Sequence, residues 1–206
     1  MREPIVFVVD DDQAMTESLS WVIESIGLKT QTFTSAHAFL DTLDTSQPGC
    51  LLLDVRMPEI SGPELQSLLK HQGTNLPIIF ISGHGDIPLA VRAMKEGAID
   101  FLTKPFNDQM LIESINKAIR TDHENRLKQH QSDAIRYRFD QLTPREKEVM
   151  SRIVVGKLNK VISAELDISL KTVEAHRASV MKKMQMKSLP ELVEASIRSD
   201  LFRENP

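Results

Sequence analysis

Apolar runs alternate with amphipathic patterns through the first 120 residues. The runs are rich in Val, Ile and Leu, and they span residues 5–9, 29–33, 50–55, 77–82 and 100–103. Short runs of this kind are typical of strands that are buried on both faces of a parallel sheet. Between them the apolar residues have helical spacing, over residues 13–25, 35–43, 62–71, 87–96 and 107–120. The alternation predicts an α/β fold with a five-stranded, doubly wound parallel sheet.

Three glycines stand just past predicted helices of this first region. They are Gly27, Gly73 and Gly97. A helix often ends where one residue adopts a left-handed backbone, which glycine does without a steric cost. We therefore expect these glycines to end their helices.

The rest of the chain has a helical pattern throughout. The apolar spacing predicts four further helices, over residues 144–155, 159–166, 170–184 and 189–199. No Gly or Pro occurs between Pro105 and Pro144, and Leu127 is the single large apolar residue between 121 and 133. Such a stretch favours a solvated helix over a loose tether. The predicted organisation is a first domain at 1–120, a helical linker at 121–140 and a smaller all-α domain at 141–206.

Charge divides the chain in the same way. The net charge is −4, yet residues 1–120 carry 9 basic and 16 acidic side chains, and residues 121–206 carry 16 basic and 13 acidic ones. Two parts of opposite charge indicate different partners. The single cysteine, Cys50, excludes an intramolecular disulfide, and the six histidines are scattered. Three aspartates interrupt the N-terminal apolar run, so we expect no signal peptide, no membrane span and a cytoplasmic location.

Polar residues follow the predicted strands of the first domain. They are Asp10, Asp11 and Asp12 after the first strand, Asp54 in the third, Ser82 at the end of the fourth and Lys104 after the fifth. Ligands of open parallel sheets bind outside the carboxyl ends of the strands, where the strand order reverses. With the order 2-1-3-4-5, the first and third strands are neighbours. Their aspartates would then converge on one pocket.

A cluster of carboxylates needs a compensating charge, and Mg²⁺ suits a ligand set that consists of oxygen atoms alone. Asp54 is then the candidate nucleophile, because a carboxylate can accept a phosphoryl group as an aspartyl phosphate. Lys104 and Ser82 are the candidate phosphate contacts. Each residue also has a purely structural interpretation. Asp12 is a good N-cap for the helix at 13–25, a role that needs no metal.

The same residues resemble a known signature. The stretches are Val8-Val9-Asp10-Asp11-Asp12, Asp54-Val55-Arg56-Met57-Pro58 with Ser61-Gly62, Ser82-Gly83-His84-Gly85-Asp86, and Lys104-Pro105-Phe106. Over residues 4–120 the chain resembles the flavodoxin-like receiver domain of FixJ-type response regulators. The resemblance implies metal ligation by Asp10, Asp11, Asp54 and the backbone carbonyl of Arg56. It also implies phosphorylation of Asp54, phosphate contacts from Lys104 and Ser82, a switch role for Phe101 and a cis bond before Pro105.

The helix predicted at 170–184 combines a basic surface with an apolar stripe. Val173, Val180, Met181 and Met184 can face a core, whereas the polar positions are Lys171, Thr172, Glu174, His176, Arg177, Lys182 and Lys183. With the short helix at 159–166 before it, this helix could enter a DNA major groove. Lys and Arg would neutralise phosphates, and polar side chains near its N-terminus would meet base edges. A solvated basic helix in an unrelated bundle is the alternative.

Further motifs favour the first interpretation. They are Leu142-Thr143-Pro144-Arg145-Glu146, Asn159-Lys160, and Ile168-Ser169 with Lys171-Thr172-Val173-Glu174-Ala175-His176-Arg177. Residues 141–200 resemble the LuxR/NarL-type helix-turn-helix domain, which implies a recognition helix at 170–184 and a phosphate near Lys183. Asp167 and Gln185 stand where that family usually has Gly. Asp tolerates a left-handed backbone at a cost of about 1 kcal/mol relative to Gly.

The sequence therefore predicts a two-component response regulator. A sensor histidine kinase would phosphorylate Asp54 with Mg²⁺, which would promote homodimerisation and binding to promoter DNA, with RNA polymerase as a further partner. One alternative is a phosphatase or phosphotransferase with an aspartyl-phosphate intermediate. Such enzymes often carry a second acid two residues after the nucleophile, where this chain has Arg56. The other alternative is a transcription factor that works without phosphorylation.

Overall fold

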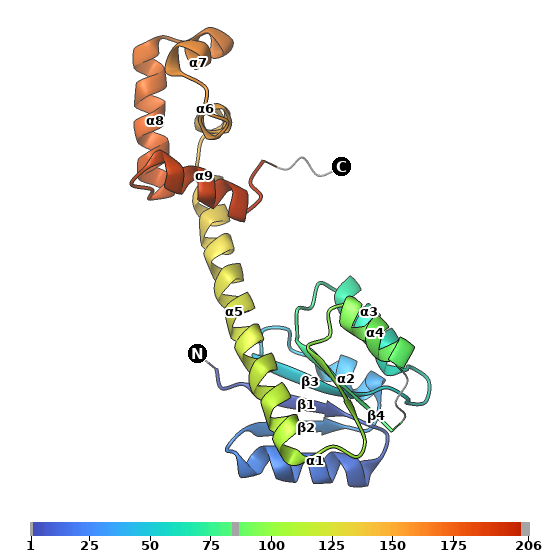
Figure 1. The fold of residues 1–206 in the computed structure, drawn as a ribbon. Coiled ribbons are helices and arrows are strands. Elements are labelled where there is room, and N and C mark those ends of the chain that lie inside the picture. Colours follow the sequence, from blue (N-terminus) through green and yellow to red (C-terminus); the bar gives the residue numbers. More distant parts are fainter. Residues whose placement is uncertain (1, 84–86, 203–206) are drawn as a thin grey trace. The chain divides into compact units, whose positions relative to one another are not determined.

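The computed structural model describes residues 2–83 and 87–202. The chain divides into two compact units, residues 1–126 and residues 127–206. Figure 1 shows the elements of each unit. Within the described residues, no helix combines the length and apolar character needed to cross a membrane.

The first unit is built on one parallel sheet, as the sequence predicted. Its strands are β1 (Ile5–Val9), β2 (Lys29–Phe33), β3 (Gly49–Asp54), β4 (Ile78–Ser82) and β5 (Asp100–Thr103). Their order is β2-β1-β3-β4-β5, and every neighbouring pair is parallel. Val9 of β1 lies opposite Leu53 of β3. The carboxyl ends of β1 and β3 therefore lie side by side.

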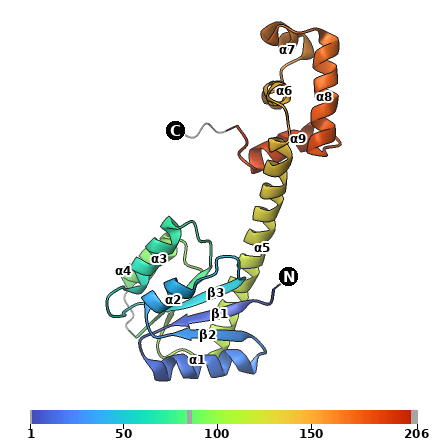
Figure 2. The ribbon, with the colours of Figure 1, turned by 180° about the vertical axis from the view of Figure 1, so that it is seen from behind.

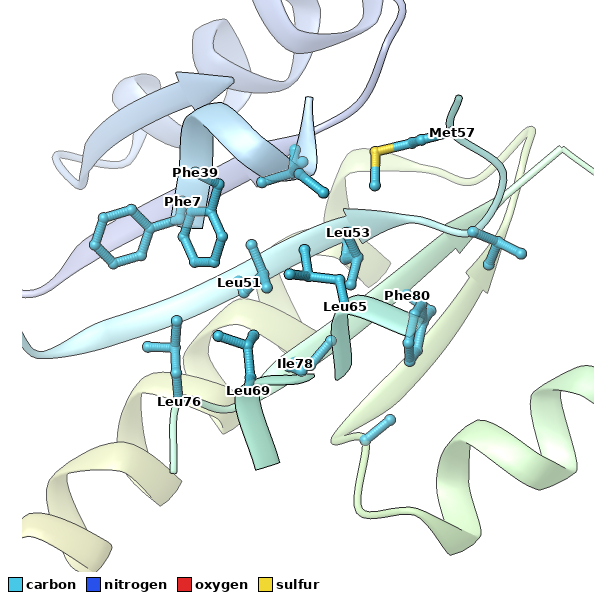
Figure 3. Packing of buried hydrophobic residues seen from close by; sticks show 14 of the residues in the cluster. Phe7, Phe39, Leu51, Leu53, Met57, Leu65, Leu69, Leu76, Ile78 and Phe80 are labelled. Atoms are coloured by element: carbon cyan, nitrogen blue, oxygen red, sulfur yellow. The ribbon is translucent and has the colours of Figure 1, made fainter. Parts of the chain in front are cut away.

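Five helices cover the two faces of this sheet (Figure 2). They are α1 (Gln13–Ser25), α2 (Ala36–Thr42), α3 (Gly62–His71), α4 (Ile87–Lys95) and α5 (Asp108–Asp140). Successive strand residues point to opposite faces, so each strand contributes to two cores. Leu51 and Leu53 pack with α2, α3 and α4, whereas Cys50 and Leu52 pack with α1 and α5. Figure 3 shows the first of these cores.

Local signals in the sequence fix the helix ends. The Asp12 side chain accepts hydrogen bonds from the backbone N–H groups of Ala14 and Met15, so it caps α1 as predicted. Gly27, Gly73 and Gly97 have φ values of 81°, 72° and 104°, which confirms their left-handed backbone. The Lys104–Pro105 bond is cis, as the receiver resemblance implied.

The second unit is a small helical bundle. It contains the end of α5 together with α6 (Pro144–Val154), α7 (Asn159–Leu166), α8 (Leu170–Met184) and α9 (Leu189–Arg198). Val173, Val180 and Met184 of α8 are fully buried in its core, and Met181 is partly buried. The apolar stripe predicted for this helix is confirmed. Asp167 and Gln185, which follow α7 and α8, both have the left-handed backbone.

Helix α5 differs from the expected pattern in one respect. It runs without a break from Asp108 to Asp140, and Leu127 is exposed. The residues from Thr121 onward were expected to be solvated, but Asp122 is only 3% exposed. The expectation was wrong there because apolar spacing does not indicate polar burial, and the Asp122 carboxylate is buried against the start of β3, where it accepts from the Gly49 backbone N–H.

Candidate functional site

The carboxyl edge of the sheet gathers the predicted polar residues. Asp10 follows β1, Asp54 ends β3, and Lys104 follows β5. The Nζ atom of Lys104 donates to Asp10 Oδ2 at 2.9 Å and to Asp54 Oδ1 at 3.0 Å. Three residues that are far apart in the sequence thus meet at one point, because parallel strands end at the same edge.

The two carboxylates are buried and held by the backbone. Asp10 is 2% exposed and Asp54 is 8% exposed. Asp10 Oδ1 accepts from the Asp12 backbone N–H at 2.9 Å, and Asp54 Oδ2 accepts from the Arg56 backbone N–H at 2.7 Å. These hydrogen bonds fix both side chains in place. A fixed carboxylate keeps its oxygen atoms in a constant position for an incoming group.

Lys104 remains charged in this environment. Burial alone lowers the pKa of Lys104, but its hydrogen bonds and charge interactions with Asp10 and Asp54 outweigh burial and raise the pKa above its ordinary value of 10.5. The lysine is positioned by its own backbone, whose N–H donates to the Ser82 carbonyl at 2.7 Å. It therefore provides a fixed positive charge between the two acids.

The other predicted residues lie around this centre. Ser82 is buried, Asp11 and the Arg56 side chain are exposed, and Phe101 is partly buried with its ring centroid 6.2 Å from that of Phe80. Residues 84–86 of the fourth-strand motif lie outside the described residues. Cys50 is fully buried, and burial raises the pKa of its thiol. The thiol is therefore part of the apolar core.

The donor set fits a hard cation such as Mg²⁺. Asp10 and Asp54 bring two negative charges against the one positive charge of Lys104, whereas the Asp11 side chain is exposed. The available atoms are oxygens, which Mg²⁺ prefers. Among residues 2–83 and 87–202, no group of three or more His, Cys, Asp or Glu side chains has the spacing of a metal site. The arrangement thus offers two carboxylates and a net negative charge.

The predicted DNA-binding residues lie on or beside α8. The Ser169 side chain caps the helix by accepting from the Thr172 backbone N–H at 3.0 Å. Lys171, Glu174 and Lys182 are exposed, as is Lys160 of α7, whereas the half-buried members of the set are Asn159, Thr172, His176, Arg177 and Lys183. The helical period places exposed Lys171 and Lys182 on the side of α8 opposite the buried stripe. Helix α8 therefore presents a polar face outward.

Lys183 makes a contact that was not predicted from the sequence. Its Nζ atom donates to Glu146 Oε2 at 2.7 Å, and Ser179 Oγ donates to Glu146 Oε1 at 2.6 Å. The Thr143 backbone N–H also donates to Glu146 Oε2, at 2.8 Å. Burial raises the pKa of Glu146, but these hydrogen bonds outweigh it and lower the pKa to about 2. The Thr-x-x-Glu capping pattern can be recognised in the sequence, but no pattern indicates that Lys183, 37 residues away, contacts Glu146.

Each of the two units is similar to a known protein family. Residues 6–116 match the response regulator receiver domain, and residues 140–196 match the luxR family of bacterial regulatory proteins. Response regulator protein TodT of Pseudomonas putida is 44% identical over 96% of this chain and 87% of its own. Transcriptional regulatory protein FixJ of Bradyrhizobium diazoefficiens is 44% identical over 97% of both chains.

Two solved structures extend the comparison. A structure of response regulator StyR matches with a TM-score of 0.81 and 42% identity, over 96% of this chain and all of that one. Full-length FixJ from B. japonicum matches with a TM-score of 0.58 and 42% identity, over 98% of this chain and all of that one. Together with the two family matches, they establish that the chain belongs to the two-component response regulators that join a receiver domain to a LuxR-type DNA-binding domain.

Proposed function

We propose that Asp54 is the phosphoryl acceptor of this regulator. The observation that carries the proposal is the single ammonium of Lys104 shared by buried Asp10 and Asp54. In the transfer, the phosphorus–nitrogen bond of a phosphohistidine on the partner kinase breaks as a bond forms between Asp54 and phosphorus. The histidine nitrogen keeps the electron pair and takes a proton. The acceptor oxygen becomes the bridging oxygen of an aspartyl phosphate, which is an acyl phosphate.

Each neighbouring residue has a defined task in this proposal. Receiver domains generally use Mg²⁺, and here Asp10, Asp11, Asp54 and the backbone carbonyl of Arg56 would hold it. The cation supplies charge neutralisation for the phosphoryl oxygens. An ammonium has three N–H donors, and Lys104 gives two of them to carboxylates, so a third can meet the phosphoryl group. Ser82 would contact another phosphoryl oxygen, and Phe101 would respond to the modification.

Phosphoryl labelling tests this assignment. We expect acetyl phosphate with Mg²⁺ to label the wild-type chain once, on Asp54, and expect chelation of Mg²⁺ to prevent labelling. Asp54→Asn should remove the label. Asp12→Asn is the matched control, because Asp12 belongs to the same acidic run but caps α1, and Asn caps a helix equally well. Undiminished labelling of the Asp54→Asn protein, measured by mass spectrometry, would contradict the assignment.

We further propose that phosphorylation promotes homodimerisation and binding of promoter DNA through α8, with RNA polymerase as a later partner in the cytoplasm. The exposed polar face of α8 and its capped N-terminus support this role. Lys171, Thr172, Glu174, His176 and Arg177 would meet bases or phosphates within the groove. The remaining proposed contacts are Asn159, Lys160, Lys182 and Lys183.

Base reading by α8 is testable without a known operator. The wild-type chain can select its preferred duplex from a random-sequence pool, and binding is then compared with a scrambled duplex. If Lys171 or Glu174 contacts a base, its replacement by Ala should change the discrimination between the duplexes by about 1–3 kcal/mol. Unchanged discrimination in both variants would contradict the placement of α8 in the groove.

The enzymatic alternative has less support. Families of response regulator transcription factors are generally not enzymes, and Arg56 occupies the position at which many aspartyl-phosphate enzymes carry their second acid. The alternatives differ in stoichiometry. A receiver accepts one phosphoryl group per chain, whereas an enzyme would turn over many donor molecules per chain, which a phosphate-release assay distinguishes.

A further inference from the structure

Helix α5 contains a buried acid that no motif of the sequence explained. Asp122 lies beyond the part of α5 that covers the sheet core, and its Oδ2 atom accepts from the Gly49 backbone N–H at 3.0 Å. Arg126, one turn later, donates from Nε to both carboxylate oxygens, at 2.8 Å and 3.0 Å. Asp122 therefore joins the start of β3 to the next turn of its own helix.

The Arg126 guanidinium also binds the loop that precedes β3. Its Nη2 atom donates to the carbonyls of Gln47 at 2.6 Å and Thr45 at 3.3 Å, and Nη1 donates to the Ser46 carbonyl at 3.1 Å. One side chain thus binds three successive carbonyls and a carboxylate. The planar guanidinium has enough donors in a rigid arrangement for this task, and a lysine ammonium does not.

The backbone that receives these contacts is rigidly placed. Gly49 begins β3, and every residue of β3 up to Asp54 is buried. A Cβ atom on Gly49 would lie 1.8 Å from the Ile5 carbonyl oxygen, so β3 and β1 are in close contact at this point. The strand that carries Asp54 at one end is therefore bonded to α5 at the other.

The contacts also coincide with the end of the first compact unit. That unit ends at Arg126, while α5 continues to Asp140. From Leu127 to Gln131 the helix residues are exposed. An exposed polar helix has little packing to keep it folded, so local opening is easy there. The pair at 122 and 126 is thus placed where α5 leaves the support of the sheet.

We propose that Asp122 and Arg126 are a positioning pair that fixes α5 to β3, so that phosphorylation of Asp54 can change DNA binding by the second unit. The inference rests on the proposed function of Asp54. A pair that only stabilised its helix would need neither the buried Gly49 contact nor the three carbonyls. Without the pair, the helix opens after residue 121 and the second unit binds DNA independently of the receiver.

Two variants of the full chain test the inference. Asp122→Asn keeps an acceptor for Gly49 but loses the charge that holds Arg126, and Arg126→Lys keeps the charge but loses the carbonyl contacts. Asp133→Asn is the matched control, since Asp133 accepts from Gln129 on the exposed part of the same helix at 2.9 Å. Three quantities are measured: acetyl phosphate labelling of Asp54, affinity for the selected duplex with and without label, and amide exchange of residues 122–133.

We expect labelling to equal that of the wild type in all variants. In the wild type, labelling should tighten DNA binding by about 5- to 150-fold, the usual range for coupled sites. In Asp122→Asn and Arg126→Lys, the anchor variants, the ratio of DNA affinity with label to affinity without label should fall toward one. Amide exchange of residues 122–133 should become faster in both, whereas Asp133→Asn should match the wild type. A wild-type ratio in the anchor variants would overturn the inference, as would unchanged amide exchange.

Failure of the proposed function gives a different result. If the wild type takes no label, the role of Asp54 fails, and amide exchange still decides whether the pair holds α5. Should Asp122→Asn not fold, Arg126→Lys leaves the buried acceptor for Gly49 intact and provides the decisive comparison.

Discussion

Each unit contains a lysine that meets a buried carboxylate, and the two sites differ in their balance of charge. In the first unit, Lys104 faces both Asp10 and Asp54. In the second, Lys183 faces Glu146 alone. The first site has a surplus negative charge at the open edge of a sheet, whereas the second is neutral.

Hydrogen bonds alone do not separate the two sites, because both oxygens of Asp10 and of Asp54 accept hydrogen bonds, as those of Glu146 do. Both oxygens of Glu146 are occupied, by Ser179 on one side and by Lys183 and the Thr143 backbone on the other. This neutral site joins α6 to α8 and has no surplus charge that would attract a cation. The surplus negative charge beside Lys104 would instead attract a cation, which in the proposed function would neutralise the charge of an incoming phosphoryl group. Charge balance, rather than burial, therefore separates the proposed phosphoryl acceptor from the structural carboxylate.

The strongest test of this contrast compares stability. Glu146→Ala should lower the free energy of unfolding of the second unit by about 3 kcal/mol, because it breaks a buried ion pair and removes the acceptor for three donors. Asp54→Asn should leave the free energy of unfolding of the first unit unchanged or raise it, because one of two repelling carboxylates is neutralised. Urea titrations followed by amide exchange in each unit measure both values. Equal losses would contradict the distinction.

Acid should weaken the second unit through Glu146. Its pKa is about 2 in the folded protein against an ordinary value of 4.5. A carboxyl group whose pKa is lowered by folding contributes its full stabilisation at pH values above its ordinary pKa. This contribution to the free energy of unfolding is lost as the pH falls from about 4.5 toward 2. The amount is on the order of 3 kcal/mol. Unfolding titrations at several pH values should show that the free energy of unfolding falls less steeply with acid in Glu146→Gln than in the wild type. An equal dependence on pH in the two proteins would contradict the pairing of Glu146 with Lys183.

A smaller effect separates two adjacent lysines of α8. Lys182 is exposed, so Lys182→Ala should weaken binding to all duplexes and reduce the salt slope by about one unit, with unchanged stability. Lys183→Ala should also destabilise the second unit, because it leaves Glu146 without its cation. DNA titrations at several salt concentrations and urea unfolding test both variants. A Lys183→Ala protein with wild-type stability would show that its role is confined to DNA.

Much of this organisation could be predicted from local patterns. Strand periodicity placed Asp10, Asp54 and Lys104 at strand ends, and the adjacency of the parallel strands β1 and β3 then brought the two aspartates together. Asp167 and Gln185 were identified as non-glycine residues where the chain turns, and both adopt the left-handed backbone. These features depend on residues close in sequence or on one topological rule.

The contacts that escaped prediction depend on tertiary packing. Asp122 lies 73 residues from Gly49, and Lys183 lies 37 residues from Glu146. The i,i+4 spacing of Asp122 and Arg126 is common on exposed helices, so it does not indicate burial. Polar residues that bind distant backbone groups do not change the spacing of apolar residues along the sequence. Their contacts can therefore be identified only in the folded structure.

The central claim is that the modification of Asp54 in the first unit controls DNA binding by the second. The most direct measurement is the affinity of the full chain for its selected duplex, before and after treatment with acetyl phosphate and Mg²⁺, in the wild type and in Asp54→Asn. We expect treatment to tighten binding by the wild type and to leave Asp54→Asn unchanged. An equal response of the two proteins, or none in a fully labelled wild type, would contradict the account.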